Sequence, residues 1–157
     1  MNRVFHAITI LTAGAFLLLA GSVVYAFDWP QNETLSDSFF SYFGQLRGGT
    51  IETSLIFKDS SDVKAADKGT VIATIREHGN DFGWFESTLG NAVIIAHANQ
   101  LVTVYANLDE ETIPANVNSV TPVIAGTPLG TSGNSGWQEG RSCLEFQVLD
   151  TKNHSAI

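Results

Sequence analysis

The sequence from Gly126 to Leu149, GTPLGTSGNSGWQEGRSCLEFQVL, decides the fold of this chain. It predicts a tight turn over Gly126–Gly130, then a glycine-rich loop, then a short strand over Cys143–Leu149. Successive side chains of a strand point to opposite faces, so this strand has one apolar and one polar face. The apolar face consists of Leu144, Phe146 and Val148, and the polar face consists of Cys143, Glu145 and Gln147.

Short β-rich runs separated by turn residues predict an all-β fold, with no helix of useful length after residue 26. The further strand candidates are Ile51–Phe57, Thr70–Ile75, Asn91–Ala98 and Leu101–Leu108. The last two runs predict a hairpin with a two-residue turn at Asn99–Gln100, which pairs His97 with Val102 and Asn107 with Ala92. This register places His97 on an apolar face with Val93, Ile95, Val102, Val104 and Ala106. It places Asn107 on the opposite face with Thr103 and Tyr105.

The spacing V-x-x-G-x-x-L-G, followed by a glycine-rich loop and x-L-x-F-x-V, resembles the C-terminal half of LytM/lysostaphin-type zinc peptidases. The matching positions are Val123, Gly126, Leu129, Gly130, Leu144, Phe146 and Val148. Further matches follow in family order at Trp29-Pro30, at F-G-x-x-R over residues 43–47, at V-x-A-x-x-x-G over residues 63–69, and along residues 95–106. The resemblance covers residues 27–150. It implies an antiparallel β-sandwich of the duplicated-hybrid-motif type.

The resemblance also implies three zinc ligands and two catalytic histidines. This sequence has a different residue from the family at each of these five positions. The positions of the family's metal ligands are occupied by Thr50, Ser54 and Glu145, and those of its catalytic histidines by Asn107 and Cys143. No histidine lies between His6 and His78, so no shift of the alignment restores the first ligand. A water-activating zinc needs its ligands and an open position together. We therefore expect neither a catalytic residue nor a cofactor.

Two chemical alternatives for the polar face are weaker. Cys143 as a nucleophile would need His97 as its base, but the predicted hairpin places His97 on the core face, and nothing in the sequence activates the thiol. A buried structural cysteine is expected instead. Cys143 and Glu145 share a face and offer two metal ligands, whereas zinc sites use three or four. The remaining candidates, His78 and His154, lie in a loop and near the C-terminus.

A binding groove inherited from the family is the remaining interpretation of this region. Its predicted floor consists of Asn107, Cys143, Glu145 and Gln147. Its predicted walls are the loops that carry Trp84 and Trp137, since loops on a rigid sheet often hold binding residues and tryptophans often anchor partners. The alternative is that each tryptophan covers an edge of the core.

The N-terminal sequence predicts export. Residues 7–26 contain no charged side chain and end in Val24-Tyr25-Ala26, which predicts a cleaved secretory signal peptide, with an uncleaved membrane anchor as the alternative. We divide the chain into residues 1–26 (signal or anchor), 27–49 (extended segment) and 50–157 (LytM-like domain). The formal net charge of −8 excludes nucleic acid as a partner. The single cysteine excludes an internal disulfide.

Together these features predict an exported, catalytically inactive LytM-like domain of the bacterial periplasm or cell envelope. The expected partner is peptidoglycan or an envelope protein such as a cell-wall hydrolase, because the resemblance implies that degenerate family members regulate such enzymes. Contact with a membrane is expected only through residues 7–26, if they are not cleaved. The alternatives are an active zinc endopeptidase that cuts peptidoglycan cross-bridges, with zinc as its cofactor, and a structural envelope domain.

Overall fold

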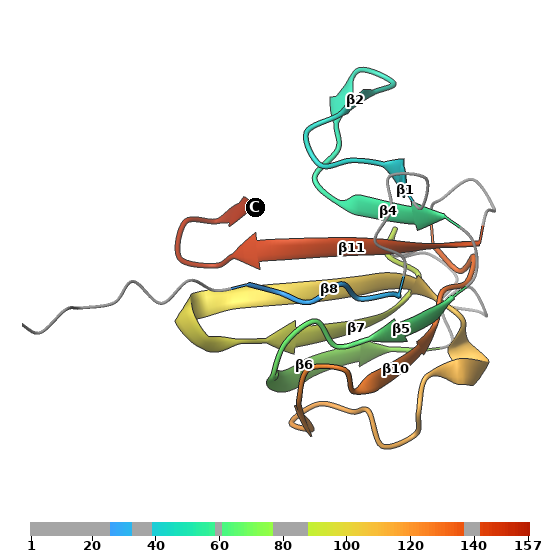
Figure 1. Cartoon of the computed structure of the whole chain (residues 1–157), viewed down its shortest axis with the longest axis vertical. Helices are drawn as coiled ribbons and strands as arrows, with labels where there is room; N and C mark the ends of the chain where they lie inside the picture. Colours follow the sequence, from blue (N-terminus) through green and yellow to red (C-terminus); the bar gives the residue numbers. More distant parts are fainter. Residues whose placement is uncertain (1–25, 33–38, 59–60, 77–87, 137–141) are drawn as a thin grey trace, which may run out of the picture.

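The computed structural model describes residues 26–32, 39–58, 61–76, 88–136 and 142–157 (Figure 1). Over these residues the chain is built of antiparallel β-strands, and the helical segments are two 3-10 turns, η2 (Ala98–Gln100) and η3 (Glu110–Thr112). The predicted all-β fold is confirmed. None of the helical segments in these ranges is long and apolar enough to cross a membrane.

One large antiparallel sheet organises the molecule. Its strands, in spatial order, are β1 (Phe39–Ser41), β4 (Leu55–Lys58), β11 (Cys143–Asp150), β8 (Leu101–Leu108), β7 (Asn91–Ala96), β6 (Gly69–Ile75) and β9 (Pro122–Val123). A last short strand, β12 (Ser155–Ala156), pairs with the end of β11. Figure 1 shows β11 and β8 side by side, and their six paired residues make them the central contact of the sheet.

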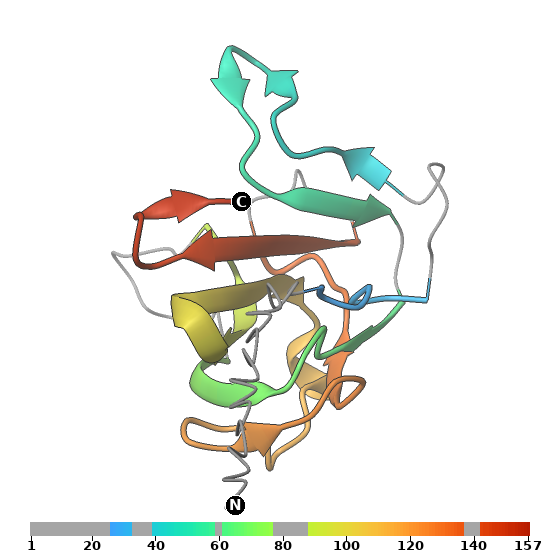
Figure 2. The ribbon, with the colours of Figure 1, turned by 60° about the vertical axis from the view of Figure 1, so that its left-hand side comes forward.

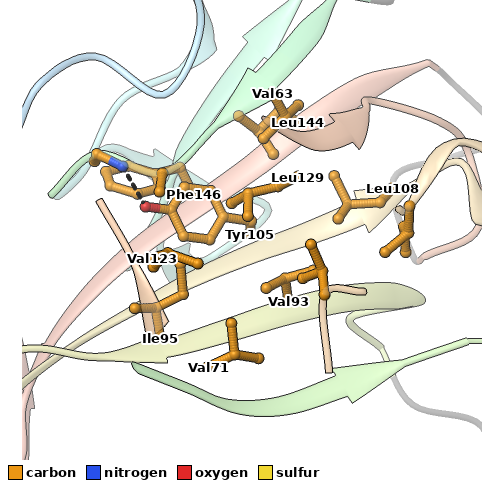
Figure 3. Packing of buried hydrophobic residues seen from close by; sticks show 14 of the residues in the cluster. Val63, Val71, Val93, Ile95, Tyr105, Leu108, Val123, Leu129, Leu144 and Phe146 are labelled. Atoms are coloured by element: carbon orange, nitrogen blue, oxygen red, sulfur yellow. Dashed lines mark hydrogen bonds between the residues drawn. The ribbon is translucent and has the colours of Figure 1, made fainter. Parts of the chain in front are cut away.

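A second, two-stranded sheet lies against one face of the large sheet. It pairs β5 (Asp62–Lys64) with β10 (Pro128–Thr131), and its Val63 and Leu129 are buried in the main core. Figure 3 shows these two side chains packed against residues of β6, β7, β8 and β11. The labelled partners are Val71, Val93, Ile95, Tyr105, Leu108, Leu144 and Phe146, with Val123 of β9. The two layers enclose one apolar core, which is the main stabilising contribution in a domain that has no disulfide.

Part of the predicted tight turn over Gly126–Gly130 is a strand, so that prediction was wrong. The turn lies just before it, where Thr127 N–H donates to Ile124 O at 3.1 Å. Residues from Pro128 onward pair with β5 because Leu129 must point into the core. The sequence Pro-Leu-Gly has turn-like composition, and tertiary burial overrides it here.

A third element stands apart from both layers. The hairpin of β2 (Leu46–Arg47) and β3 (Thr50–Ile51) projects from the sheet edge in both views (Figures 1 and 2). Its cross-strand pair Leu46 and Ile51 is 69% and 63% exposed. The predicted strand over Ile51–Phe57 is therefore interrupted, because the chain leaves this hairpin at Ile51 and enters the sheet only at Leu55.

The β7–β8 hairpin exists as predicted, but its predicted register was wrong. The turn is the 3-10 segment η2, in which Asn99 and Gln100 have φ values of 58° and 64°. As a result Ala96 pairs with Val102, and Val93 pairs with Tyr105. A change of one residue in register exchanges the two faces of a strand.

The exchange moves different side chains of β8 into the main core. Thr103 and Tyr105 are fully buried there, with Val93 and Ile95 of β7. Val104 and Ala106 instead pack with Ala92 on the opposite face of the sheet. The expected apolar partners of His97 on β8 were therefore wrong, and the neighbour that its Nε2 contacts is Thr103 Oγ1, at 2.7 Å.

Tyr105 fixes the second layer to the large sheet. Its hydroxyl accepts a hydrogen bond from Ala66 N–H at 2.7 Å (Figure 3). It also lies 3.3 Å from Thr103 Oγ1. Burial raises the pKa of the Tyr105 hydroxyl from 10.0 to about 12, because the phenolate would lose its hydration.

This pKa makes the stability of the fold sensitive to alkali. Because the pKa of Tyr105 is higher in the folded protein than in the unfolded one, its contribution to the free energy of unfolding is complete below pH ~10. This contribution declines as the pH rises toward ~12. We expect the free energy of unfolding to fall by about 2–3 kcal/mol over this range in excess of the fall in Tyr105→Phe. Urea denaturation of both proteins at each pH measures the difference. Parallel curves would contradict the role of Tyr105.

Candidate functional site

Four of the five altered family positions lie on β11 or on the segments that flank it. Glu145 on β11 pairs with Ile56 of β4 on one side and with Ala106 of β8 on the other. Ser54 directly precedes β4, and Asn107 follows Ala106 along β8. Thr50 lies elsewhere, exposed on β3 in the projecting hairpin.

The predicted alternation along β11 is confirmed. Leu144 and Phe146 are buried in the main core. Glu145 and Gln147 are half-buried on the other face, where the Gln147 Nε2 donates to Glu145 Oε1 at 3.1 Å. Cys143 begins this polar row but is buried, as expected of a structural cysteine.

Asn107 does not line a groove, and the prediction that it faces one was wrong. Its side chain is fully buried, and its backbone has a φ of 63°, in the left-handed region that asparagine tolerates better than most residues. The amide Nδ2 donates to Gly133 O at 2.6 Å and to Cys143 O at 2.8 Å, and it lies 3.2 Å from Cys143 Sγ. Its Oδ1 accepts from Gly136 N–H at 2.7 Å.

These bonds make Asn107 a link between β8, β11 and the glycine-rich loop. Two backbone bonds run beside it: Gly133 N–H donates to Asn107 O at 2.7 Å, and Cys143 N–H donates to Gly133 O at 3.0 Å. The loop over Gly133–Gly136 is thereby held against β8. The side chain at this family position has a structural role in this chain.

Neither Asn107 nor His97 is placed to act as a catalytic base for Cys143. Asn107 contacts its thiol, and an amide cannot accept a proton from it. His97 lies at the turn end of the β7–β8 hairpin, whereas Cys143 lies beside the open end. The ring nitrogens of His97 contact Lys68 O at 2.8 Å and Thr103 Oγ1 at 2.7 Å, so both are already engaged.

The residues at the family's metal positions do not fit a zinc ion. Thr50 is an exposed hydroxyl on the projecting hairpin, and the Ser54 hydroxyl is buried and donates to Glu52 Oε1. Glu145 alone offers a ligand of the kind that zinc prefers, and zinc sites take at least three from the protein. Within the described ranges no three side chains of His, Cys, Asp or Glu cluster as metal ligands.

An apolar row of side chains on the neighbouring strands lies beside Glu145 and Gln147, and it was not predicted from the sequence. Glu145, Gln147 and Leu149 of β11 pair with Ala106, Val104 and Val102 of β8, respectively. The buried members of this cluster are Ala92, Val104 and Ala106, and the half-buried ones are Ile75, Leu89, Ile94, Val102 and Leu149. The incorrect hairpin register had assigned the β8 residues to the core face. The proposed wall residues Trp84 and Trp137 lie outside the described residues, as does His78.

The family follows from the sequence over this same part of the chain. Residues 53–157 match the model of peptidase family M23. The chain belongs to this family. The fold and family predicted from the LytM/lysostaphin-like motifs are thus confirmed.

Known relatives of this M23 domain span several kinds of protein. An uncharacterized protein of Treponema pallidum (strain Nichols) is 34% identical over 121 residues, which cover 71% of this chain and 79% of that protein. A zinc-containing peptidase from Vibrio cholerae is similar in structure, with a TM-score of 0.62 and 20% identity, over 85% of this chain and 39% of the peptidase. The SpoIIQ–SpoIIIAH pore-forming complex gives a TM-score of 0.54 and 18% identity, over 83% of this chain and 76% of the matched one. At these identities the structural likeness shows the fold alone.

Proposed function

We propose that this M23 domain is catalytically inactive and binds a component of the bacterial cell envelope. The contact between Asn107 and Cys143 carries the proposal. The resemblance places catalytic histidines at these two positions, and here a buried amide and a buried thiol occupy them. Neither can act as a general base near neutral pH in these surroundings.

The substitutions at the metal positions support the same conclusion. A catalytic zinc holds its water in an open coordination position while protein ligands fill the others. Two hydroxyls and one carboxylate replace the family set, and one of those hydroxyls, on Thr50, lies on a separate hairpin. Without the family's ligand set, the domain would hold neither a zinc ion nor the zinc-bound water that would act as the nucleophile.

The proposed partner is peptidoglycan or an envelope protein such as a cell-wall hydrolase. The apolar run over residues 7–26 supports export. The SpoIIQ–SpoIIIAH complex shows that a structure with this fold can take part in a protein assembly. The exposed apolar side chains of the β1–β3 region, with the half-buried Glu145 and Gln147, offer binding surface. Those apolar side chains are Phe40, Tyr42, Phe43, Leu46 and Ile51.

The zinc content of the purified protein tests the proposal that the domain is catalytically inactive. We expect the purified protein to retain far less than one equivalent of zinc after dialysis, because three ligand positions lack nitrogen and sulfur donors. Elemental analysis measures this, with the Vibrio cholerae zinc-containing peptidase purified in parallel as the positive control. Glu145→Ala should leave the value unchanged.

The opposite result would favour the active zinc endopeptidase. Stoichiometric zinc in the wild-type protein, lost in Glu145→Ala and accompanied by release of peptides from cross-linked peptidoglycan, would establish that alternative. Co-sedimentation with purified peptidoglycan then separates the two partner classes, since an envelope-protein ligand leaves the protein in the supernatant.

A further inference from the structure

A pocket on the other side of the large sheet is independent of the family site. It has a volume of about 330 Å³, within the usual range of small-molecule sites. Its lining residues are Asp28, Trp29, Gln31, Asn32, Lys64, Ala125 and Gly126. Lys64 ends β5, which covers the core face of the sheet, whereas Glu145 and Gln147 point to the opposite face. The pocket and the inherited groove therefore do not share a surface.

Backbone hydrogen bonds fix the three chain segments that form the pocket. Residues 26–32 run beside β5 (Figure 2), where Lys64 N–H donates to Pro30 O and Asp28 N–H donates to Ala66 O, both at 2.8 Å. The turn at Gly126 is tied to the same strand end, since Gly126 N–H donates to Ala65 O at 2.8 Å. The pocket is thus formed before any ligand arrives, which limits the entropy cost of binding.

Trp29 presents a large apolar surface at this pocket. Its indole packs against Phe39 and Phe57, with ring centroids 5.6 Å and 6.0 Å away, and is still 43% exposed. Aromatic neighbours on one side hold the ring in place, so its free surface is a rigid platform. Rigid, partly exposed tryptophans are the side chains that most often anchor a ligand.

The other lining side chains are polar and of both charges. Lys64 Nζ donates to Asn32 Oδ1 at 2.7 Å, so the Asn32 amide protons point away from that bond. The Asp28 carboxylate accepts hydrogen bonds only, whereas Lys64 and the Asn32 amide donate. Gln31 is nearly fully buried, donates from Nε2 to Ser132 Oγ at 3.2 Å, and has an Oε1 with no donor among the described residues.

We propose that this pocket binds a neutral saccharide unit of an envelope glycan. A sugar ring offers an apolar C–H face to an indole and hydroxyls that both donate and accept, which matches Trp29 beside a set of separate donors and acceptors. The opposite charges of Asp28 and Lys64 cancel, and the chain carries a net charge of −8, so the pocket does not favour an anionic polymer. The open form of the pocket suits one unit of a longer strand.

The test is a calorimetric titration of the full chain, kept in solution by a detergent without a sugar headgroup. The probes are a soluble oligomer of β-1,4-linked N-acetylglucosamine, a β-1,4-glucan oligomer of equal length, and a zwitterionic dipeptide. We expect at least one oligosaccharide to bind and the dipeptide not to bind. Trp29→Ala should weaken oligosaccharide binding about tenfold or more.

Matched variants separate binding from folding. Ile72→Ala, which removes an exposed apolar side chain that does not line the pocket, should bind as the wild type does. Lys64→Gln changes the polar lining without touching the aromatic packing, and should weaken binding while leaving the urea denaturation midpoint near that of the wild type. No saturable binding of either oligosaccharide, preferential binding of the dipeptide, or normal binding by Lys64→Gln and Trp29→Ala overturns the proposal. The zinc measurement is unaffected by any of these results.

Discussion

Asn107→Ala is expected to lower the free energy of unfolding by about 3 kcal/mol or more. The alanine leaves Gly133 O and Cys143 O without the Nδ2 donor and Gly136 N–H without its acceptor, all in a buried region. Each unpaired buried group costs roughly 1–3 kcal/mol. Alanine also tolerates the φ of 63° less well than asparagine does. Urea denaturation followed by circular dichroism measures the loss.

Two further substitutions separate the causes. Asn107→Asp keeps the size and the acceptor but cannot donate, so it should reproduce most of the loss. Asn107→Gly removes the amide but accepts the left-handed backbone, so it should be less harmful than alanine by about 1 kcal/mol. A loss below about 1 kcal/mol in all three variants would show that Asn107 does not hold the glycine-rich loop.

The contacts of Asn107 are an example of what could not be predicted from the sequence. The sequence predicted the polar and apolar faces of β11 correctly, because alternation is a local property of a strand. The role of Asn107 depends on a loop more than 20 residues away, over Gly133–Gly136, that folds back onto β8. A strand pattern contains no information on that contact.

The hairpin error has a different physical cause. Asn99 and Gln100 both lie in the left-handed region that a two-residue turn requires, but His97 N–H donates to Leu101 O beyond the turn, which shifts the pairing by one residue. Val102, Val104 and Ala106 make one face of β8 apolar, but the face with Thr103 and Tyr105 lies in the main core, so the hydrophobic pattern favours the wrong register. The apolar row beside Glu145 was therefore assigned to the core. The saccharide pocket could not be predicted at all, since its three segments meet only in the folded chain.

Gly90→Ala is expected to have a comparably large effect, about 3 kcal/mol or more, because the residue lies against the loop that Asn107 holds. A Cβ at Gly90 would lie 2.5 Å from the Ser135 carbonyl carbon and 2.7 Å from Gly136 Cα, and closer still to Gly136 N. These are backbone atoms, which cannot rotate away as a side chain would. Ser135 is also fixed, because its Oγ donates to Leu108 O at 2.7 Å and accepts from Asn91 N–H at 3.0 Å.

Gly126→Ala is the matched control for this close approach. Gly126 has a φ of 82° and Gly90 one of 65°, so alanine is strained at both positions, but a Cβ at Gly126 meets no atom within 4 Å. We expect Gly126→Ala to cost only about 1 kcal/mol. The difference between the two losses in urea denaturation then measures the packing of the loop on β7 and β8. If the two variants lose the same amount, the loop moves away without cost, and its close packing on β7 and β8 does not contribute to the stability of the fold.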